Sequence, residues 1–235
     1  MKNILRKIIQ RTGFDFHRYR PVPDRSKFWQ SLNIKTILDI GANVGQFARE
    51  AREKLPEAQI YSFEPLKQCF EALEKGFEKE PKFKAFNYAL GDKERELEMH
   101  KSSYTPSSSI LQMSDVHKDL FPHTKEHTQE KIFVKKLDDI AKELNLQKEL
   151  LIKVDVQGFE DKVIAGGENI FKIAKVILIE TSFVELYKNQ PSFDDIYQKL
   201  KSLGFKYHGS MQEKVDKHSG KIISEDSLFI RSNQR

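Results

Sequence analysis

The stretch TILDIGANVGQF, residues 36–47, decides the fold of this chain of 235 residues. Its apolar first half predicts a β-strand with Asp39 near its end, and a glycine-containing turn then leads directly into a helix. Gly41 and Gly45 let the backbone come close to a ligand, and the helix N-terminus favours a negative group. Their G-x-x-x-G spacing differs from the G-x-G-x-x-G that holds a dinucleotide pyrophosphate, and it suits a smaller anion such as a carboxylate.

From residue 35 onward, short apolar runs alternate with amphipathic stretches, which is typical of repeated βα units and a mostly parallel sheet. We predict strands over residues 36–40, 59–63, 82–87, 150–156 and 175–180. Helices are predicted over residues 45–54, 66–79, 137–144, 160–165 and 193–203. A closing pair of strands is predicted at 204–208 and 227–231, around a polar turn at 216–220.

Two further strand ends carry residues that suit a nucleotide. Glu64 closes the second strand in IYSFEP, residues 60–65, where a carboxylate can accept hydrogen bonds from both ribose hydroxyls. The third strand ends in FNYALGD, residues 86–92, which places Asn87 and Ala89 where an adenine would lie. Because ligands of open α/β sheets bind at the carboxyl ends of the strands, the three strand ends together predict one nucleotide-like site.

Taken in order, six segments of this chain resemble the FkbM family of S-adenosylmethionine-dependent methyltransferases: LDIGANVGQF (38–47), SFEP (62–65), NYALGD (87–92), LDDI (137–140), LIKVDVQGFEDKVIAGG (151–167) and ILIET (177–181). The resemblance covers residues 35–203, and KVDVQGFE is its most specific element. It implies a Rossmann-like class I methyltransferase fold, an α/β architecture whose mostly parallel seven-stranded sheet has one antiparallel strand and helices on both faces. It also implies O-methylation, often of sugars or natural-product hydroxyls. The family commonly has Glu where this chain has Gln157.

The resemblance also implies which residues hold the cofactor, S-adenosylmethionine. The methionine part would be lined by the first turn and helix, the ribose by the second strand end, and the adenine by the third. The residues assigned to this site are Asp39, Gly41, Ala42, Asn43, Gly45, Phe47, Glu64, Pro65, Asn87, Ala89 and Asp155.

A hydroxyl acceptor needs a group that removes its proton, usually a carboxylate or a histidine. Asp155 ends the apolar strand LLIKVDV and is our first candidate, although it can equally hold the turn or the donor's amino group. Glu180, in ILIETS, is the second candidate, the alternative being a hydrogen-bonded strand terminus. Glu160 is expected either to contact the substrate or to favour the helix N-terminus. Lys153 is expected to point away from the site or to pack its stem within the sheet.

The segment between Gly91 and Val134 breaks the alternation of strands and helices. A hairpin is expected within residues 94–100, followed by a run rich in Ser, Thr, Pro and His over 102–129. Loops of this length inside a compact domain often act as lids or binding segments. We therefore predict a lid or substrate loop at 101–130, with Ser108 and Ser109 contacting the acceptor.

His123 and His127 stand four residues apart, with His117 and Glu126 nearby. In a helix this spacing would present two imidazoles on one face, as in zinc sites. Pro122 and the polar surroundings favour a solvated loop instead, and no metal is predicted.

The net charge of +5 is unevenly distributed along the chain. Residues 1–30 carry eight Lys/Arg and two Asp/Glu, so this segment has a charge of +6 and the rest of the chain −1. We treat 1–30 as a basic N-terminal segment and 31–235 as one methyltransferase domain. Residues 1–13 predict a basic amphipathic helix, which either contacts an anionic membrane surface or a partner, or packs against the domain's own flank.

The nearly neutral remainder disfavours nucleic acid as a partner, because nucleic-acid enzymes spread basic residues over their binding face. A single cysteine, Cys69, and the lack of a long apolar run predict a cytoplasmic protein, with any membrane contact at the inner surface. The partner we expect is a small-molecule or glycan hydroxyl acceptor. Two alternatives stay open: a nicotinamide-dependent oxidoreductase, which the glycine spacing disfavours, and a noncatalytic nucleotide- or nucleic-acid-binding protein on the same fold.

Overall fold

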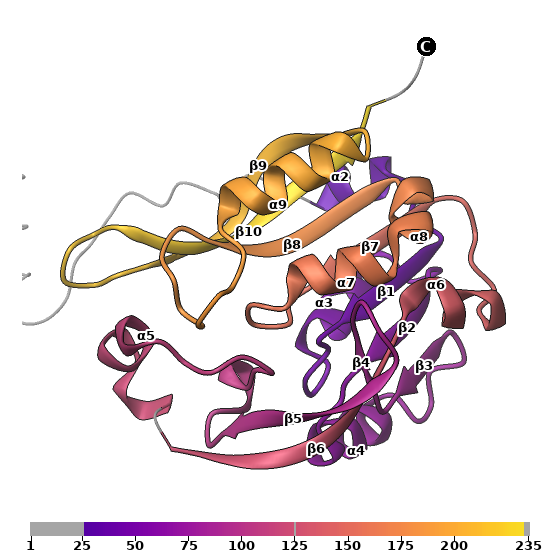
Figure 1. Ribbon diagram of the computed structural model, residues 1–235. Helices are drawn as coiled ribbons and strands as arrows, with labels where there is room; N and C mark the ends of the chain where they lie inside the picture. The colour runs from indigo at the N-terminus through magenta and orange to yellow at the C-terminus, as the bar shows by residue number, and fades with distance from the viewer. Residues whose placement is uncertain (1–25, 125, 233–235) are drawn as a thin grey trace, which may run out of the picture.

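The computed structural model describes residues 26–124 and 126–232, and its centre is a seven-stranded sheet (Figure 1). The strands run in the spatial order β3-β2-β1-β7-β8-β10-β9. β10 is antiparallel to both of its neighbours, while the other paired strands are parallel. The strands are β1 (Thr36–Ile40), β2 (Gln59–Phe63), β3 (Phe83–Phe86), β7 (Leu150–Val154), β8 (Val176–Ser182), β9 (Phe205–Val215) and β10 (Ile222–Arg231). The predicted α/β class and the single antiparallel strand are confirmed.

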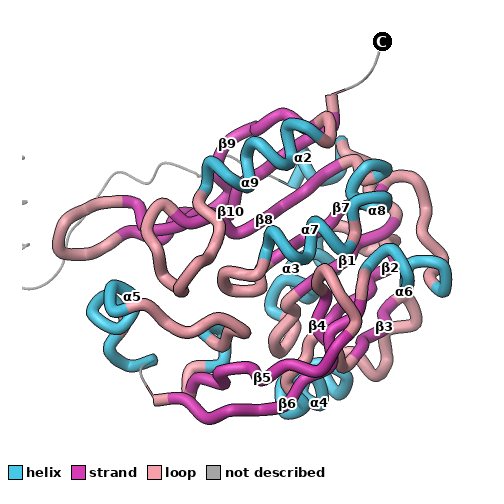
Figure 2. Tube along the Cα trace, in the orientation of Figure 1, coloured by secondary structure: helices cyan, strands magenta, loops and turns pink. Residues whose placement is uncertain are grey.

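Helices cover both faces of this sheet (Figure 2). Period-two alternation sends Ile37 and Leu151 into the core under one helix layer, and Leu38 and Ile152 into the core under the other. All five residues of β1 and of β7 are buried, as expected for strands covered on both sides. One layer holds α2 (Ser26–Ser31), α3 (Gln46–Lys54) and α4 (Lys67–Gly76), and the other holds α6 (Leu137–Ile140), α7 (Glu160–Gly166), α8 (Glu168–Ile173) and α9 (Phe193–Ser202).

The segment after β3 differs from its prediction. Residues 94–100 do not form a hairpin of their own: from Arg95 onward they belong to β5 (Arg95–Ser102), which pairs antiparallel with β6 (His127–Lys135). With β4 (Ala89–Leu90) these strands make a second sheet in the order β4-β6-β5. β6 could not be recognised in the sequence because only alternate residues such as Ile132 and Val134 are buried, and the first half of the strand is polar and exposed.

Residues 103–126, which we call the insertion, connect β5 to β6. The insertion contains η1 (Thr105–Ser107), α5 (Asp115–Leu120) and η2 (Pro122–Thr124), so the predicted loop is largely ordered into short helices. The β9–β10 hairpin is also longer than predicted, because its outer part is polar and its register was not visible as an apolar run. In Figure 1 this hairpin extends beyond the sheet on the left, above α5.

Candidate active site

The turn after β1 has the conformation that its glycines predict. Gly41 has φ +83°, and a Cβ at this position would lie 1.9 Å from the main-chain oxygen of Asp155. The turn therefore packs directly on the end of β7, which only a residue without a side chain allows. Gly45 has φ +88° and faces Leu73 and Phe77 rather than the site, so its role is to seat α3. The expectation that Gly45 lines the methionine part stays a prediction.

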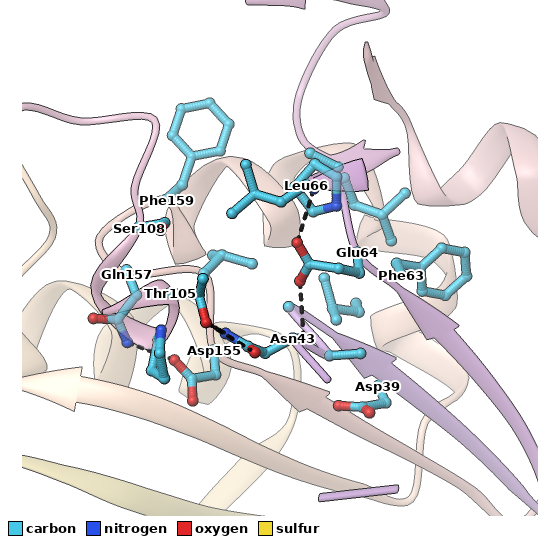
Figure 3. A pocket seen from close by; sticks show the side chains of 18 of the residues that line it. Asp39, Asn43, Phe63, Glu64, Leu66, Thr105, Ser108, Asp155, Gln157 and Phe159 are labelled. Atoms are coloured by element: carbon cyan, nitrogen blue, oxygen red, sulfur yellow. Dashed lines mark hydrogen bonds between the residues drawn. The ribbon is translucent and has the colours of Figure 1, made fainter. Parts of the chain in front are cut away.

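A cavity of about 280 Å³, which we call the donor cavity, opens at the carboxyl ends of β1, β2 and β7 (Figure 3). Side chains from the first turn, the second strand end, the insertion and the turn after β7 all reach it. Of the residues predicted to hold the cofactor or substrate, its lining includes Asp39, Gly41, Ala42, Asn43, Phe47, Glu64, Pro65, Ala89, Ser108 and Asp155.

Glu64 is held rigidly at the wall of this cavity. Its Oε2 accepts a hydrogen bond from the main-chain N–H of Asn43, and its Oε1 accepts one from that of Leu66, both at 2.8 Å (Figure 3). Burial raises the pKa of Glu64 to about 7, although these two hydrogen bonds oppose the rise. Each carboxylate oxygen keeps a second lone pair, so the group can still accept hydrogen bonds from two neighbouring hydroxyls.

Asp39 supplies an unfilled acceptor to the same cavity. Its Oδ2 accepts a hydrogen bond from Ser62 Oγ at 3.2 Å, but its buried Oδ1 has no partner among the residues that the structure describes. Burial raises the pKa of Asp39 to about 6, against the attraction of Lys153. A buried carboxylate oxygen without a partner is costly, and a positively charged ligand group would relieve that cost. The residues present therefore fit S-adenosylmethionine, whose amino and sulfonium groups are cationic and whose ribose is a diol.

Buried Lys153 and half-buried Asp155 form an ion pair at the end of β7. Lys153 Nζ lies 2.8 Å from Asp155 Oδ2, and the lysine side chain is only 8% exposed. Burial by itself would raise the pKa of Asp155, but the charge and hydrogen bond of Lys153 outweigh it and lower the pKa to about 2. Of the two alternatives for Lys153, pointing away from the site is wrong, because its side chain lines the donor cavity, while a stem packed within the sheet agrees with its 8% exposure. Residues two apart in a strand share a face, so Lys153 lies beside Asp155.

Gln157 connects two carboxylates with one amide. Its Nε2 donates to Asp155 Oδ1 at 2.6 Å and also to Glu180 Oε2, while its Oε1 accepts a hydrogen bond from Tyr187 Oη at 2.8 Å. Burial and the nearby charge of Asp155 raise the pKa of Glu180 to about 7. Lys214 Nζ, from the β9–β10 hairpin, lies 3.3 Å from Glu180 Oε1. Sequence patterns gave no indication of Tyr187 or Lys214, because both come from segments far from β7 in the chain.

Three residues that were predicted to contact a ligand form hydrogen bonds with main-chain groups around the site. Glu160 accepts hydrogen bonds from the main-chain N–H groups of Val156 and Gly158, which holds the turn after β7. Ser109 Oγ donates to the main-chain oxygen of Gln157 at 2.6 Å. Asn87 Nδ2 donates to the main-chain oxygens of Glu64 and Pro65. These side chains therefore take part in hydrogen bonds within the protein, and the substrate contacts expected of Glu160 and Ser109 and the adenine contact expected of Asn87 stay predictions.

A second cavity of about 280 Å³ adjoins the donor cavity. The two share Tyr104, Pro106, Asp155 and Gln157, so they meet at the end of β7. The insertion and the β9–β10 hairpin supply its outer walls, and Glu180 belongs to this cavity alone. Its lining residues are Tyr104, Pro106, Ser107, His117, Phe121, His123, Asp155, Gln157, Glu180, Leu186 and Lys214.

The histidines considered for a metal are spread over different elements, His117 in α5, His123 in η2 and His127 in β6. Within residues 26–124 and 126–232 no group of three or more His, Cys, Asp or Glu side chains is arranged to hold a metal ion.

A family model described as "Methyltransferase FkbM domain" matches residues 39–207. The chain belongs to this family. A 2-O-methyltransferase, NoeI of Sinorhizobium fredii, is 29% identical to this FkbM methyltransferase over 160 residues, which is 66% of each chain. Methyltransferase 1 of Beauveria bassiana is 28% identical over 181 residues, 72% of this chain and 71% of that one. The chain thus matches about two thirds of the length of these relatives.

The fold of this FkbM methyltransferase is shared with a solved structure. The methyltransferase domain of bacterial CtHen1-C is 10% identical, with a TM-score of 0.51 over 88% of this chain and 94% of that one. The predicted family is confirmed, and S-adenosylmethionine is the cofactor of this methyltransferase. In the part of the chain that the structure describes, no helix has both the length and the apolar character needed to cross a membrane.

Proposed function

We propose that this FkbM methyltransferase transfers the methyl group of S-adenosylmethionine to a hydroxyl oxygen of a sugar, a glycan or another small molecule. The observation that carries the proposal is the meeting of the two cavities at Asp155 and Gln157, with the Glu180 carboxylate in the second one. A donor in the first cavity and an acceptor in the second would face each other across this junction. The relative NoeI, named as a 2-O-methyltransferase, supports oxygen as the methylated atom.

On the donor side, Glu64 would hold the ribose hydroxyls, and Asp39 would hold a cationic group with its unpartnered Oδ1. When bound, S-adenosylmethionine supplies a methyl group already activated by its positive sulfur. The enzyme's main contribution is therefore to position donor and acceptor in line. The rigid carboxylates and the glycine turn of the donor cavity serve that purpose.

Glu180 is better suited than Asp155 to remove the proton from the acceptor. A general base works best when its pKa lies near the operating pH. Burial and the charge of Asp155 raise the pKa of Glu180, whereas Lys153 Nζ and Gln157 Nε2 each bind one oxygen of Asp155 and lower its pKa, which makes Asp155 the weaker base. Glu180 would take the hydroxyl proton of the acceptor, whose oxygen would receive the methyl group that S-adenosylmethionine supplies when bound, with the bonding electron pair left on sulfur. Asp155, fixed by Lys153 and Gln157, orients the junction.

Two amide variants test this assignment. We expect Glu180→Gln to lower turnover by about 100-fold while the affinity for S-adenosylmethionine stays within about twofold. Asp155→Asn breaks the pair with Lys153 beside the donor cavity, so it should weaken donor binding as well as turnover. Calorimetry measures donor affinity, and transfer of radiolabelled methyl to a panel of glycans and small alcohols measures turnover. Wild-type turnover by Glu180→Gln, or binding of a nicotinamide cofactor in place of S-adenosylmethionine, would refute the proposal.

For location, we propose the cytoplasm, with residues 1–13 contacting the anionic inner membrane surface. Support comes from the +6 charge of residues 1–30, and this segment up to residue 25 lies outside the described residues. Cosedimentation of the full chain with anionic vesicles, compared with a chain lacking residues 1–13, tests it. Equal sedimentation of the two would contradict the proposal.

A further inference from the structure

A third cavity, of about 320 Å³, adjoins the donor cavity, and the two share Gln46, Phe47 and Lys153. Its lining comes from α2, from α3 and from the strands β7, β8, β9 and β10. Its volume is at the lower end of the range for small-ligand sites, about 300–1,000 Å³. The proposed methyl transfer takes place in the donor and second cavities, so it leaves this third cavity without a role.

The wall of the third cavity is mostly apolar. Trp29 of α2, Leu55 after α3, and Leu151 and Leu178 of the sheet all line it, and all four belong to one buried hydrophobic cluster. An apolar hollow favours an occupant that covers it, because the apolar surface is then removed from water. The occupant should therefore present apolar or aromatic groups to this wall.

A carboxylate gives the same wall a negative component. Asp226 is half-buried, and burial raises its pKa although nearby lysines attract it. The two lysines in the lining are already paired, Lys54 with Glu50 and Lys153 with Asp155. A further cation beside Asp226 would stabilise its ionised form. The third cavity thus favours an occupant that combines apolar rings with a positive charge.

The chain itself contains such an occupant directly before α2. Residues 14–25, FDFHRYRPVPDR, which we call the strap, lie outside the described residues. The strap has three aromatic side chains, Phe14, Phe16 and Tyr19, and an arginine on each side of Tyr19. Its composition therefore matches both the apolar wall and the carboxylate of the third cavity.

The strap is also attached next to this cavity. α2 begins at Ser26, directly after the strap, and Trp29, three residues further along, lines the cavity. Twelve extended residues reach about 40 Å, which is more than enough to lie along a cavity of this size. A short tether gives an attached segment an effective concentration of about a millimolar, so the strap has an advantage over a free ligand or a second copy of the chain.

We propose that the strap binds in the third cavity, with its aromatic side chains against the apolar wall and an arginine beside Asp226. The bound strap would contact Phe47 and Lys153, which also line the donor cavity, and Lys153 Nζ lies 5.9 Å from the centre of the Phe47 ring. Binding of the strap therefore supports one wall of the donor cavity and raises the affinity for S-adenosylmethionine. Residues 1–13 are not needed for this contact.

Crosslinking of the full chain tests where the strap binds. A benzophenone side chain replaces Phe16, and mass spectrometry identifies the crosslinked peptides after irradiation. We expect crosslinks within one copy of the chain, either to α3 or to Met211 and Gln212 of β9, which line the third cavity. The same group in place of Leu5 is the control and should give no crosslinks to these segments.

A pair of full-chain variants tests what the strap does. Phe16→Ala/Tyr19→Ala removes two aromatic side chains from the strap, and Leu5→Ala/Ile8→Ala removes two apolar side chains from residues 1–13 as the control. Trp29 is the only tryptophan in the sequence, so its fluorescence reports on the third cavity. In the strap variant alone we expect the Trp29 emission to shift to the red and calorimetry to show S-adenosylmethionine binding at least about threefold weaker. Thermal unfolding shows whether each variant folds.

Three results would overturn the inference. The first is that the benzophenone at position 16 gives crosslinks only to other surfaces of the domain, only between two copies of the chain, or none at all. The second is that Phe16→Ala/Tyr19→Ala has the Trp29 emission of the wild type, and the third is that it has the donor affinity of the wild type. These measurements need no acceptor, so a failure of the proposed methyl transfer to oxygen would leave their outcome unchanged.

Discussion

Replacing Lys153 by Met is the perturbation whose consequences can be followed furthest. The lysine lies within the attraction of three carboxylates, Asp155, Asp226 and Asp39, and its own pKa is held above its usual value mainly by Asp155 against the effect of burial. Methionine has a similar length but no charge, so the change removes the cation and keeps much of the packing. Asp155 would then be a buried carboxylate without its cation.

The cost can be worked out from the pair itself. The pKa of Asp155 falls from 3.8 to about 2 in the folded enzyme. At about 1.4 kcal/mol per pKa unit, this net shift, which combines burial with the effects of Lys153, Gln157 and Glu180, corresponds to about 2–3 kcal/mol. Removing one partner of a buried pair costs about 3–5 kcal/mol. Because the Asp155 side chain is 33% exposed, water offsets part of that loss, and we expect Lys153→Met to lower the free energy of unfolding by about 3 kcal/mol at pH 7.

The pH dependence identifies the cause. In the wild-type enzyme the lowered pKa of Asp155 gives stability that is present above its unfolded value of 3.8 and lost as pH falls through about 2. In Lys153→Met burial is opposed by the hydrogen bonds of Gln157 and Glu180 but no longer by a cation, so we expect the folded pKa of Asp155 to rise above the unfolded value. The loss of unfolding free energy caused by Lys153→Met should therefore become smaller as pH falls from about 7 to about 5, because Asp155 takes up a proton in the folded variant.

Urea unfolding at both pH values measures the difference in free energy of unfolding between the wild type and Lys153→Met. The double variant Lys153→Met/Asp155→Asn should recover part of the stability, since the carboxylate in direct contact with Lys153 is gone while Asp39 and Asp226 still lack the cation. Lys67→Met, at an exposed pair with Glu71, is the matched control and should change little. A deficit below about 1 kcal/mol, or one that does not change with pH, would refute this reasoning.

Two further predictions concern the chemistry. Glu64→Gln should weaken S-adenosylmethionine binding at least about 10-fold in calorimetry, because an amide cannot accept both main-chain N–H groups and two ribose hydroxyls. Glu71→Gln is the control and should have no effect. Equal affinity of Glu64→Gln and the wild type would contradict the assignment of Glu64 to the ribose. Turnover at saturating donor should fall as pH drops below about 7, because protonated Glu180 cannot take the acceptor's proton, and Glu180→Gln should abolish this dependence. A wild-type rate that stays flat through this range would exclude Glu180 as the base.

The residues of the donor cavity were predictable because they lie in short segments of the sequence that can each be recognised on their own. A strand, a glycine turn and a helix follow one another around Gly41, and strand ends of a parallel sheet meet at one edge whatever their spacing in the chain. The same locality limits what the sequence can predict. Gly45 and Asn87 occupy the predicted positions, but whether a residue faces a ligand or its neighbours is decided by packing, which the pattern does not contain.

The acceptor half could not be predicted from neighbouring residues. His117 and Lys214 are almost a hundred residues apart, and they meet because the insertion and the β9–β10 hairpin fold toward each other. Lys153 is a different case: its two-residue spacing from Asp155 in a strand already predicts a shared face. Applying the strand period to charged residues as well as apolar ones would have placed Lys153 in the site.

Gln157 shows why an amide suits the junction of the two cavities. It is held at φ +55° in the turn after β7, and its Nε2 donates to Asp155 and Glu180 at once. A carboxylate there would add a third negative charge and could donate to neither side chain unless it were protonated. The amide instead keeps Asp155 paired with Lys153 and leaves Glu180 with a pKa of about 7. One neutral side chain thus keeps apart an ionised carboxylate that orients the site and a carboxylate able to exchange a proton near neutral pH.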